Sequence, residues 1–146
     1  MTTVSIDVDR PADEVFAYAT DPTLFPEWQE GVVSGSLQTN GEPTVGDLCR
    51  TTRRIGGAER PSTSRLVRFE PPRSWSVHGL DGPIRARVDL DVTPAGDGKS
   101  RVTIAVDFEG HGIGRLLVPL VVRRQANAEM PKNMARLKAQ IEAAAY

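Results

Sequence analysis

The sequence predicts one α+β domain over residues 1–146, in which a curved antiparallel sheet of about seven strands is closed by a long C-terminal helix. Short alternations of apolar and polar residues, separated by turn sequences, fill most of the chain from residue 32 to 110. The last part differs, because its apolar residues recur at helical spacing. Strands joined by tight turns form an antiparallel meander, and the terminal helix is the one element long enough to cover its apolar face.

The N-terminal part predicts one strand followed by two short helices. Thr3–Val8 alternates apolar and polar residues, as a half-buried strand does. Pro11 suits the first position of a helix, which must end near Asp21 because a proline follows. Asp21 is the expected cap of the second short helix, which carries Phe25 and Trp28.

Six further strands are expected, each bounded by turns that contain glycine or proline. Their ranges are Val32–Gln38, Gly46–Ile55, Ser62–Glu70, Arg73–Leu80, Ile84–Thr93 and Arg101–Glu109. From Ile84 to Val92 every second residue is apolar and the others are arginine or aspartate. That pattern indicates a strand with one buried and one solvated face.

The segment from Gly112 to Ala145 predicts a helix in two parts. An apolar stripe runs along one helical face, at Met130, Met134, Leu137, Ile141 and Ala144. Pro119 and Pro131 interrupt the segment, and an interior proline removes a hydrogen bond and clashes with the preceding turn. We therefore expect a first piece over Gly114–Val122, a kinked or broken junction, and then a regular helix. The part before Pro131 is the expected mouth and gate of a ligand site.

Composition excludes several classes of protein. The chain is 39% hydrophobic and 25% charged, as an ordinary globular domain is, and its formal net charge of −1 argues against nucleic-acid binding. The longest apolar run, Leu116–Val122, is far shorter than the roughly 20 residues that cross a bilayer. No secretory signal is evident and Cys49 has no cysteine to pair with, so we expect a cytoplasmic monomer or homodimer without membrane insertion.

The opening of the chain resembles a known superfamily. Pro11–Asp21, followed by Pro26 and Trp28, is similar to the opening signature of the polyketide cyclase/dehydrase-like proteins. Two shorter similarities occur at Glu70–Arg73 and at Leu137, Lys138 and Glu142. The resemblance implies the helix-grip (START, or SRPBCC) fold with a deep apolar cavity between sheet and helix. Members of that superfamily include aromatase/cyclases, carriers of lipids, sterols and quinones, hormone receptors and chaperone co-activators.

The resemblance implies that the chain binds a hydrophobic or aromatic small molecule, such as a lipid or polyketide, with transport or sequestration as the associated roles. Two alternatives stay open: a cyclase, aromatase or dehydratase acting on a polyketide-like substrate, and a protein-interaction module. Ligand cavities are mostly apolar with a few placed polar groups. The expected ligand contacts are Phe25, Trp28, Arg50, Trp75, Val88, Leu90, Phe108, Leu117, Val121 and Gln125.

Three of these contacts depend on details that the sequence leaves open. Arg50 shares one strand face with Thr52 and Arg54. It would meet a ligand carboxylate or enolate oxygen if that face is concave, and solvent if it is convex. Trp28 and Trp75 are equally expected as core residues, because large aromatic side chains bury the most area.

No catalytic residue, metal ligand or cofactor is expected. His78 and His111 would each suit a general base near neutral pH, but an exposed or structurally bonded histidine is the default interpretation. Two histidines and one cysteine, without an HExxH or paired CxxC motif, give no metal signature. Cys49 is expected to be a small buried residue.

Overall fold

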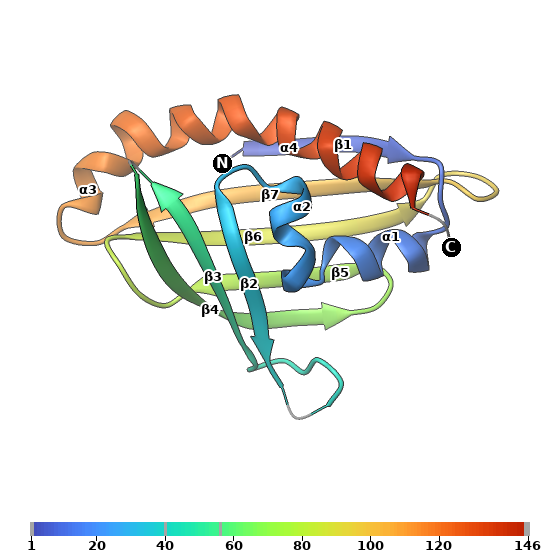
Figure 1. Cartoon of the computed structure of the whole chain (residues 1–146), viewed down its shortest axis with the longest axis horizontal. Coiled ribbons are helices and arrows are strands. Elements are labelled where there is room, and N and C mark those ends of the chain that lie inside the picture. Colours follow the sequence, from blue (N-terminus) through green and yellow to red (C-terminus); the bar gives the residue numbers. More distant parts are fainter. Residues whose placement is uncertain (1, 40, 56, 145–146) are drawn as a thin grey trace.

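The computed structural model describes residues 2–39, 41–55 and 57–144, which form a seven-stranded antiparallel sheet with helices on one face (Figure 1). The strands are β1 (Thr2–Val8), β2 (Val32–Gln38), β3 (Leu48–Ile55), β4 (Ala58–Glu70), β5 (Ser74–Gly79), β6 (Ile84–Pro94) and β7 (Ser100–Gly110). Their order across the sheet is β1-β7-β6-β5-β4-β3-β2, so the meander runs from β2 to β7 and β1 adds at the far edge. The predicted helix-grip fold is confirmed.

The helices follow β1 and β7. They are α1 (Ala12–Ala19), the 3₁₀ turn η1 (Pro22–Leu24), α2 (Phe25–Trp28), α3 (Gly114–Leu117), the π-helical turn η2 (Val118–Val122) and α4 (Arg123–Ala143). Asp21 caps η1 as predicted, because its carboxylate accepts a hydrogen bond from the backbone N–H of Thr23 at 3.0 Å. The two predicted short helices after the first strand are therefore confirmed.

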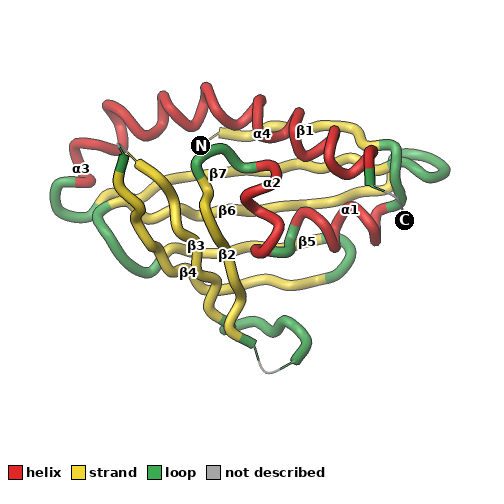
Figure 2. Tube along the Cα trace, in the orientation of Figure 1, coloured by secondary structure: helices red, strands yellow, loops and turns green. Residues whose placement is uncertain are grey.

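The terminal segment is helical from Gly114 to Ala143 without a break (Figure 2). The irregularity expected near Pro119 takes the form of the π-helical turn η2, which contains this proline. A π turn loosens the regular hydrogen-bond ladder, and a residue without an N–H is tolerated there. Pro131 lies inside α4 without ending it. Of the two forms expected for the junction, kinked or broken, the break is not found, and a π turn joins the two parts.

The apolar stripe of α4 closes the core as predicted. Met134, Leu137 and Ile141 are at most 1% exposed, and Met130 packs at the edge of the core. The helix packs on β1 and α2, while α1 covers β6 and β7 (Figure 1). Together these helices cover the end of the sheet that lies beside the C-terminal end of α4.

The C-terminal end of α4 is tied to the turn between β1 and α1. The carboxylate of Glu142 accepts hydrogen bonds from the backbone N–H of Asp9 at 2.9 Å and from Nζ of Lys138 at 2.6 Å. The guanidinium of Arg10 donates to the carbonyl oxygen of Glu142 at 2.5 Å. These contacts fasten the helix at the covered end of the sheet.

Because of these contacts of Glu142, we expect the free energy of unfolding to decrease at acidic pH. The hydrogen bonds from Lys138 and from the Asp9 N–H hold the pKa of Glu142 below its ordinary value of 4.5. The stabilisation is therefore complete above that ordinary value and is lost as pH falls through the lower folded-state pKa. We expect Glu142→Gln to reduce the free energy of unfolding at pH 7 by up to about 1 kcal/mol, since the pair is partly exposed, and to matter less towards pH 3. Urea unfolding across this pH range measures the difference, and a loss that does not vary with pH contradicts the prediction.

The beginning of the terminal helix is held against the turn between β5 and β6. A Cβ atom on Gly114 would lie 1.8 Å from the carbonyl oxygen of Pro83. The same oxygen accepts a hydrogen bond from the backbone N–H of His111 at 2.8 Å. Only glycine permits so close an approach of two main chains, so α3 starts at a fixed position.

Candidate functional site

The sheet has an inner face, which carries the core and faces the helices, and an outer face. Cys49 on β3 is 2% exposed and belongs to the core. Side chains alternate along a strand, so Thr51 and Arg53 lie on the inner face with it. The register of β3 with β4 pairs Cys49 with Ser64, Thr51 with Ser62, and Arg53 with Arg60. Residues directly opposite one another share a face, so this end of the inner face is polar.

Burial divides the inner face in two. At the covered end, Leu66, Leu90 and Val102 are at most 2% exposed. Towards the β3–β4 hairpin, Thr51 and Ser64 are half-buried and Ser62 is exposed, although all three face inward. We call this second region the open half of the inner face. It comprises Thr51, Arg53, Ser62, Ser64, Ala86, Val88 and Phe108.

One side of the open half is apolar and the other is polar. Ala86 pairs with Phe108 across β6 and β7, and both are half-buried. Val88 and Phe108 also pack against the edge of the core. On β3 and β4, the hydroxyl oxygens of Thr51 and Ser62 are 3.1 Å apart. An amphipathic molecule would meet carbon on one side and hydroxyl groups on the other.

Arg53 lies on the side of the open half that faces the helices. Its guanidinium donates a hydrogen bond to Oε1 of Gln29 at 3.3 Å. Surrounding protein lowers the pKa of Arg53 by desolvation, and the carboxylate of Glu129 on α4 partly offsets this effect. The same side chain is nevertheless exposed to solvent. The contact with Gln29 and the nearby charge of Glu129 place Arg53 between β3 and the helices.

A second polar group lies deeper in the interior. Trp28 is 4% exposed, and its Nε1 has no hydrogen-bond acceptor among the described residues. Its ring lies edge-to-face on Phe25, with centroids 5.8 Å apart, and Phe25 contacts Trp75 at 6.1 Å. Buried indole N–H groups ordinarily have a partner, so this donor is available to an acceptor that enters the interior.

The structure brings several of the predicted contact residues to the interior. Phe25, Trp28, Trp75 and Leu90 are at most 6% exposed and belong to the core, as was expected for both tryptophans. Val88 and Phe108 line the apolar side of the open half. Val88 and Phe108 therefore border the candidate site, whereas the other four residues belong to the core beside it.

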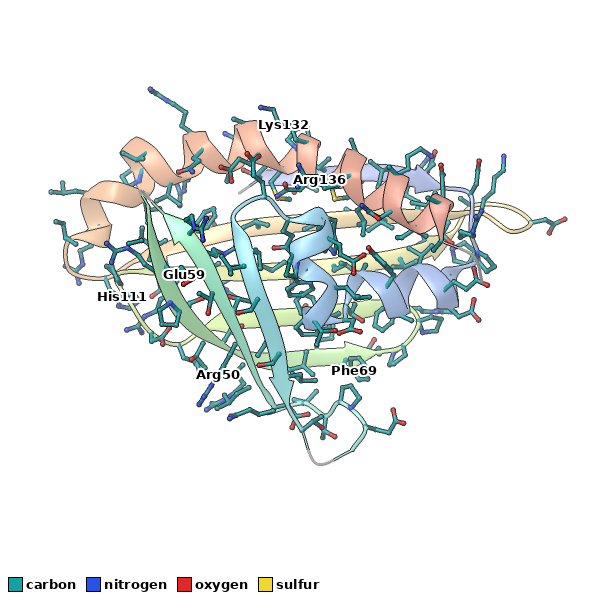
Figure 3. All side chains as sticks on the ribbon, in the orientation of Figure 1. Arg50, Glu59, Phe69, His111, Lys132 and Arg136 are labelled. Atoms are coloured by element: carbon teal, nitrogen blue, oxygen red, sulfur yellow. The ribbon has the colours of Figure 1, made fainter. Side chains whose placement is uncertain are left out.

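Three of the other predicted contacts lie elsewhere. Arg50 is exposed on the outer face, where Figure 3 shows it at the margin of the molecule. Val121 is 51% exposed, and Gln125 is exposed and donates to Oε1 of Glu129 at 3.0 Å. The side chain of Leu117 lies outside the described part of the structure.

The arginine of β3 on the inner face is Arg53, which the sequence prediction missed. The strand offered one signal for it, because Cys49 and Ile55 are the apolar residues in phase with Arg53. Leu48, however, is an apolar residue in phase with Arg50, so both faces of the strand carry an apolar residue and an arginine. Alternation alone therefore did not tell which face is concave.

The remaining reactive side chains are not on the open half. His78 lies on the outer face, paired with Arg65 and Arg87 in the register. Nε2 of His111 is 3.1 Å from a carboxylate oxygen of Glu109, in the loop before α3. Burial raises the pKa of the Cys49 thiol to about 11, so it stays protonated and is a poor nucleophile at neutral pH.

A hollow on the outer face of the sheet is not this site. It has a volume of about 580 Å³ and is bordered by Ser74, Asp91 and Thr103, which pair in one row of the outer face. It is open to solvent, and the hydroxyl of Ser74 already donates to Asp91 at 2.8 Å. The twist of the sheet produces such a depression without any bound molecule.

A curved sheet that grips a terminal helix, with a concave inner face open at one end, defines a START-type ligand-binding fold. The chain belongs to the family described as polyketide cyclase / dehydrase and lipid transport, whose model matches residues 2–142. No curated protein matches the sequence.

Solved structures share the fold at low identity. The Zhui aromatase/cyclase from Streptomyces sp. R1128 is 15% identical, with a TM-score of 0.74 over 97% of this chain and 92% of that one. A START superfamily protein from Mycobacterium smegmatis is 14% identical, with a TM-score of 0.75 over 97% and 96%. The di-domain ARO/CYC BexL of the BE-7585A biosynthetic pathway is 20% identical, with a TM-score of 0.76 over 97% of this chain. The chain spans 46% of the length of BexL.

Proposed function

We propose that the protein binds a hydrophobic or aromatic small molecule on the open half of the inner face. The observation that carries this proposal is Arg53, a solvent-exposed guanidinium on the inner face that donates a hydrogen bond to Gln29 next to α2. The apolar body of the ligand packs against Ala86, Val88 and Phe108. Its polar end, an oxygen that accepts hydrogen bonds, points towards Arg53 and the β3–β4 hydroxyl groups.

The two kinds of contact have different roles. Burying apolar surface contributes roughly 25 cal/mol per Å² before the costs of association, so the ligand body supplies most of the affinity. A guanidinium paired with a carboxylate or carbonyl oxygen fixes orientation and selects for anionic or strongly polar ends. The buried Nε1 of Trp28 offers one more donor to an oxygen that reaches the interior.

The family supports a hydrophobic ligand, because its description joins polyketide cyclases with lipid transport. The positions of His78 and His111, on the outer face and in the loop before α3, favour binding, transport or sequestration over acid–base catalysis. We therefore place binding ahead of a cyclase or dehydratase activity.

Two fluorescent probes test the site and its polar end separately. 8-Anilino-1-naphthalenesulfonate is an aromatic anion, and N-phenyl-1-naphthylamine is a neutral molecule of similar shape. We expect the folded protein to bind both probes. Arg53→Gln should weaken the binding of the sulfonate roughly tenfold, about 1.4 kcal/mol, and leave the affinity for the neutral probe unchanged.

Arg50→Gln is the matched control, since it removes the same charge from the outer face of the same strand. It should leave both affinities unchanged. If the folded protein binds neither probe, the proposed function is wrong. If Arg50→Gln and Arg53→Gln weaken the binding of the sulfonate equally, the ligand does not lie on the open half.

A further inference from the structure

The α3–η2 segment exposes apolar side chains at one end of the molecule. Ile113 and Leu116 are each 66% exposed, and Val121 is 51% exposed. On the opposite side of the same segment, Val118 is only 4% exposed. The segment is thus apolar towards the protein and towards solvent, whereas a surface helix ordinarily has a polar outward face.

The other exposed large apolar residues are scattered. Val33 is on β2, Val45 is in the following loop, Val67 is on β4 and Leu80 follows β5. Single exposed apolar residues of that kind are normal and need no explanation. Ile113, Leu116 and Val121, by contrast, lie within nine residues of one another at the start of the terminal helix. Such a cluster indicates a surface that another phase or molecule covers.

The charged residues within this segment all have one sign. Between residues 113 and 124 the charged residues are Arg115, Arg123 and Arg124, and none is acidic. Arg123 is 3.5 Å from Asp107. Arg115 and Arg124 are exposed, and neither forms an ion pair with another residue of the described structure. Apolar side chains bordered by arginines are typical of segments that lie in the interface of an anionic bilayer.

We propose that this surface docks on an anionic lipid membrane, with Ile113, Leu116 and Val121 entering the headgroup boundary and Arg115 and Arg124 meeting lipid phosphates. We call these five residues the α3–η2 patch. The proposal goes beyond ligand binding and does not depend on it.

The shape of the molecule permits this docking. Figure 1 places α3 at one extremity of the longest axis, where a flat surface can approach it without meeting the sheet. No helix in the described part of the chain is long and apolar enough to cross a membrane. The segment would therefore lie in the interface rather than span it.

A second copy of the chain fits the patch less well. A two-fold contact through the patch would bring Arg115 and Arg124 of both copies to the rim of one apolar interface, with no acid from this segment to pair with them. Like charges at a rim disfavour association, whereas lipid phosphates complement them.

Co-sedimentation with vesicles tests the proposal on the full chain. We expect binding to phosphatidylcholine vesicles that contain phosphatidylglycerol, and much weaker binding to phosphatidylcholine alone. Ile113→Ser with Leu116→Ser should lower the partition coefficient roughly tenfold or more on the mixed vesicles. Arg115→Gln with Arg124→Gln should lower it by roughly fivefold per arginine on the mixed vesicles only.

Two controls remove similar groups elsewhere. Val45→Ser removes an apolar side chain that is 57% exposed in the β2–β3 loop, and Lys132→Gln removes a charge from the side of α4 that Figure 3 shows facing away from the sheet. Both should bind as the unaltered protein does. All of these substitutions are at exposed positions, and circular dichroism verifies that each variant is folded.

Three outcomes overturn the proposal. One is a folded protein that does not bind the mixed vesicles, and another is binding that the two patch variants retain in full. The third is a concentration-dependent dimer in sedimentation velocity that Ile113→Ser with Leu116→Ser abolishes, without any vesicle binding, which would assign the patch to a second copy. A failure of probe binding on the open half would leave this result unaffected.

Discussion

Replacing Leu137 with alanine is expected to lower the free energy of unfolding by about 3 kcal/mol. Leu137 is fully buried between Met134 and Ile141 on the stripe by which α4 closes the core. Removal of its isobutyl group forfeits the transfer free energy of the lost carbons. It also leaves a cavity that the neighbours, packed on β1 and α2, do not fill.

The matched control is Leu116→Ala, the same substitution at a site 66% exposed in the same helical run. It should change stability by less than about 0.5 kcal/mol. Urea unfolding monitored by circular dichroism measures both variants, and equal m-values are required for the comparison. Similar losses for the two variants would mean that α4 does not close the core through this stripe.

Gly114→Ala is the substitution with the next largest expected effect, a loss of about 2–3 kcal/mol. The new Cβ atom would lie 1.8 Å from the carbonyl oxygen of Pro83, which is main chain and has no side-chain freedom to yield. Either α3 moves away from the β5–β6 turn or the turn itself shifts. Both changes strain the hydrogen bond from the His111 N–H to that oxygen.

Gly112→Ala separates this clash from backbone strain. Gly112 has φ of +61° and no atom within 4 Å of its added Cβ, so alanine there costs about 1 kcal/mol through the left-handed conformation alone. Amide hydrogen exchange at His111 gives a local measure, which should rise more in Gly114→Ala than in Gly112→Ala. Equal exchange and equal stability in the two variants would show that the close approach is not required.

The sequence predicted the strands well where alternation is strict. Every predicted strand is present, and β6 runs over Ile84–Pro94 against an expected Ile84–Thr93. Strands of this kind are predictable because one buried and one solvated face impose a period of two on the residues themselves. The Asp21 cap was predictable for a similar reason, since its hydrogen bond is local.

Prediction from the sequence was wrong where the surroundings of a residue depend on strands that are distant along the chain. β4 begins at Ala58 rather than at the predicted Ser62, and it includes Pro61. β5 reaches β4 only as far as Ser64, opposite Gly79, so the earlier part of β4 pairs with β3 alone. A proline is tolerated on such a free edge, because its missing N–H has no strand to bond.

The long terminal segment divides differently from the prediction. Its periodicity alone determined the stripe of Met134, Leu137 and Ile141, because helical spacing and apolar character are properties of the sequence. The π turn at Pro119, the contact of Gly114 with Pro83 and the outward position of Leu116 depend on where β7 and the β5–β6 turn lie.

The same distinction holds for the candidate site. The sequence determined that β3 carries arginines on both of its faces, since alternation assigns Arg50 and Arg53 to opposite sides. Only the tertiary structure decided that Arg53 is the one on the concave side, because the curvature of a sheet arises from the pairing of all its strands and the helices packed on them. Which side chains can meet a ligand is therefore set by the assembled fold, although the residues that build that fold are evident from their order.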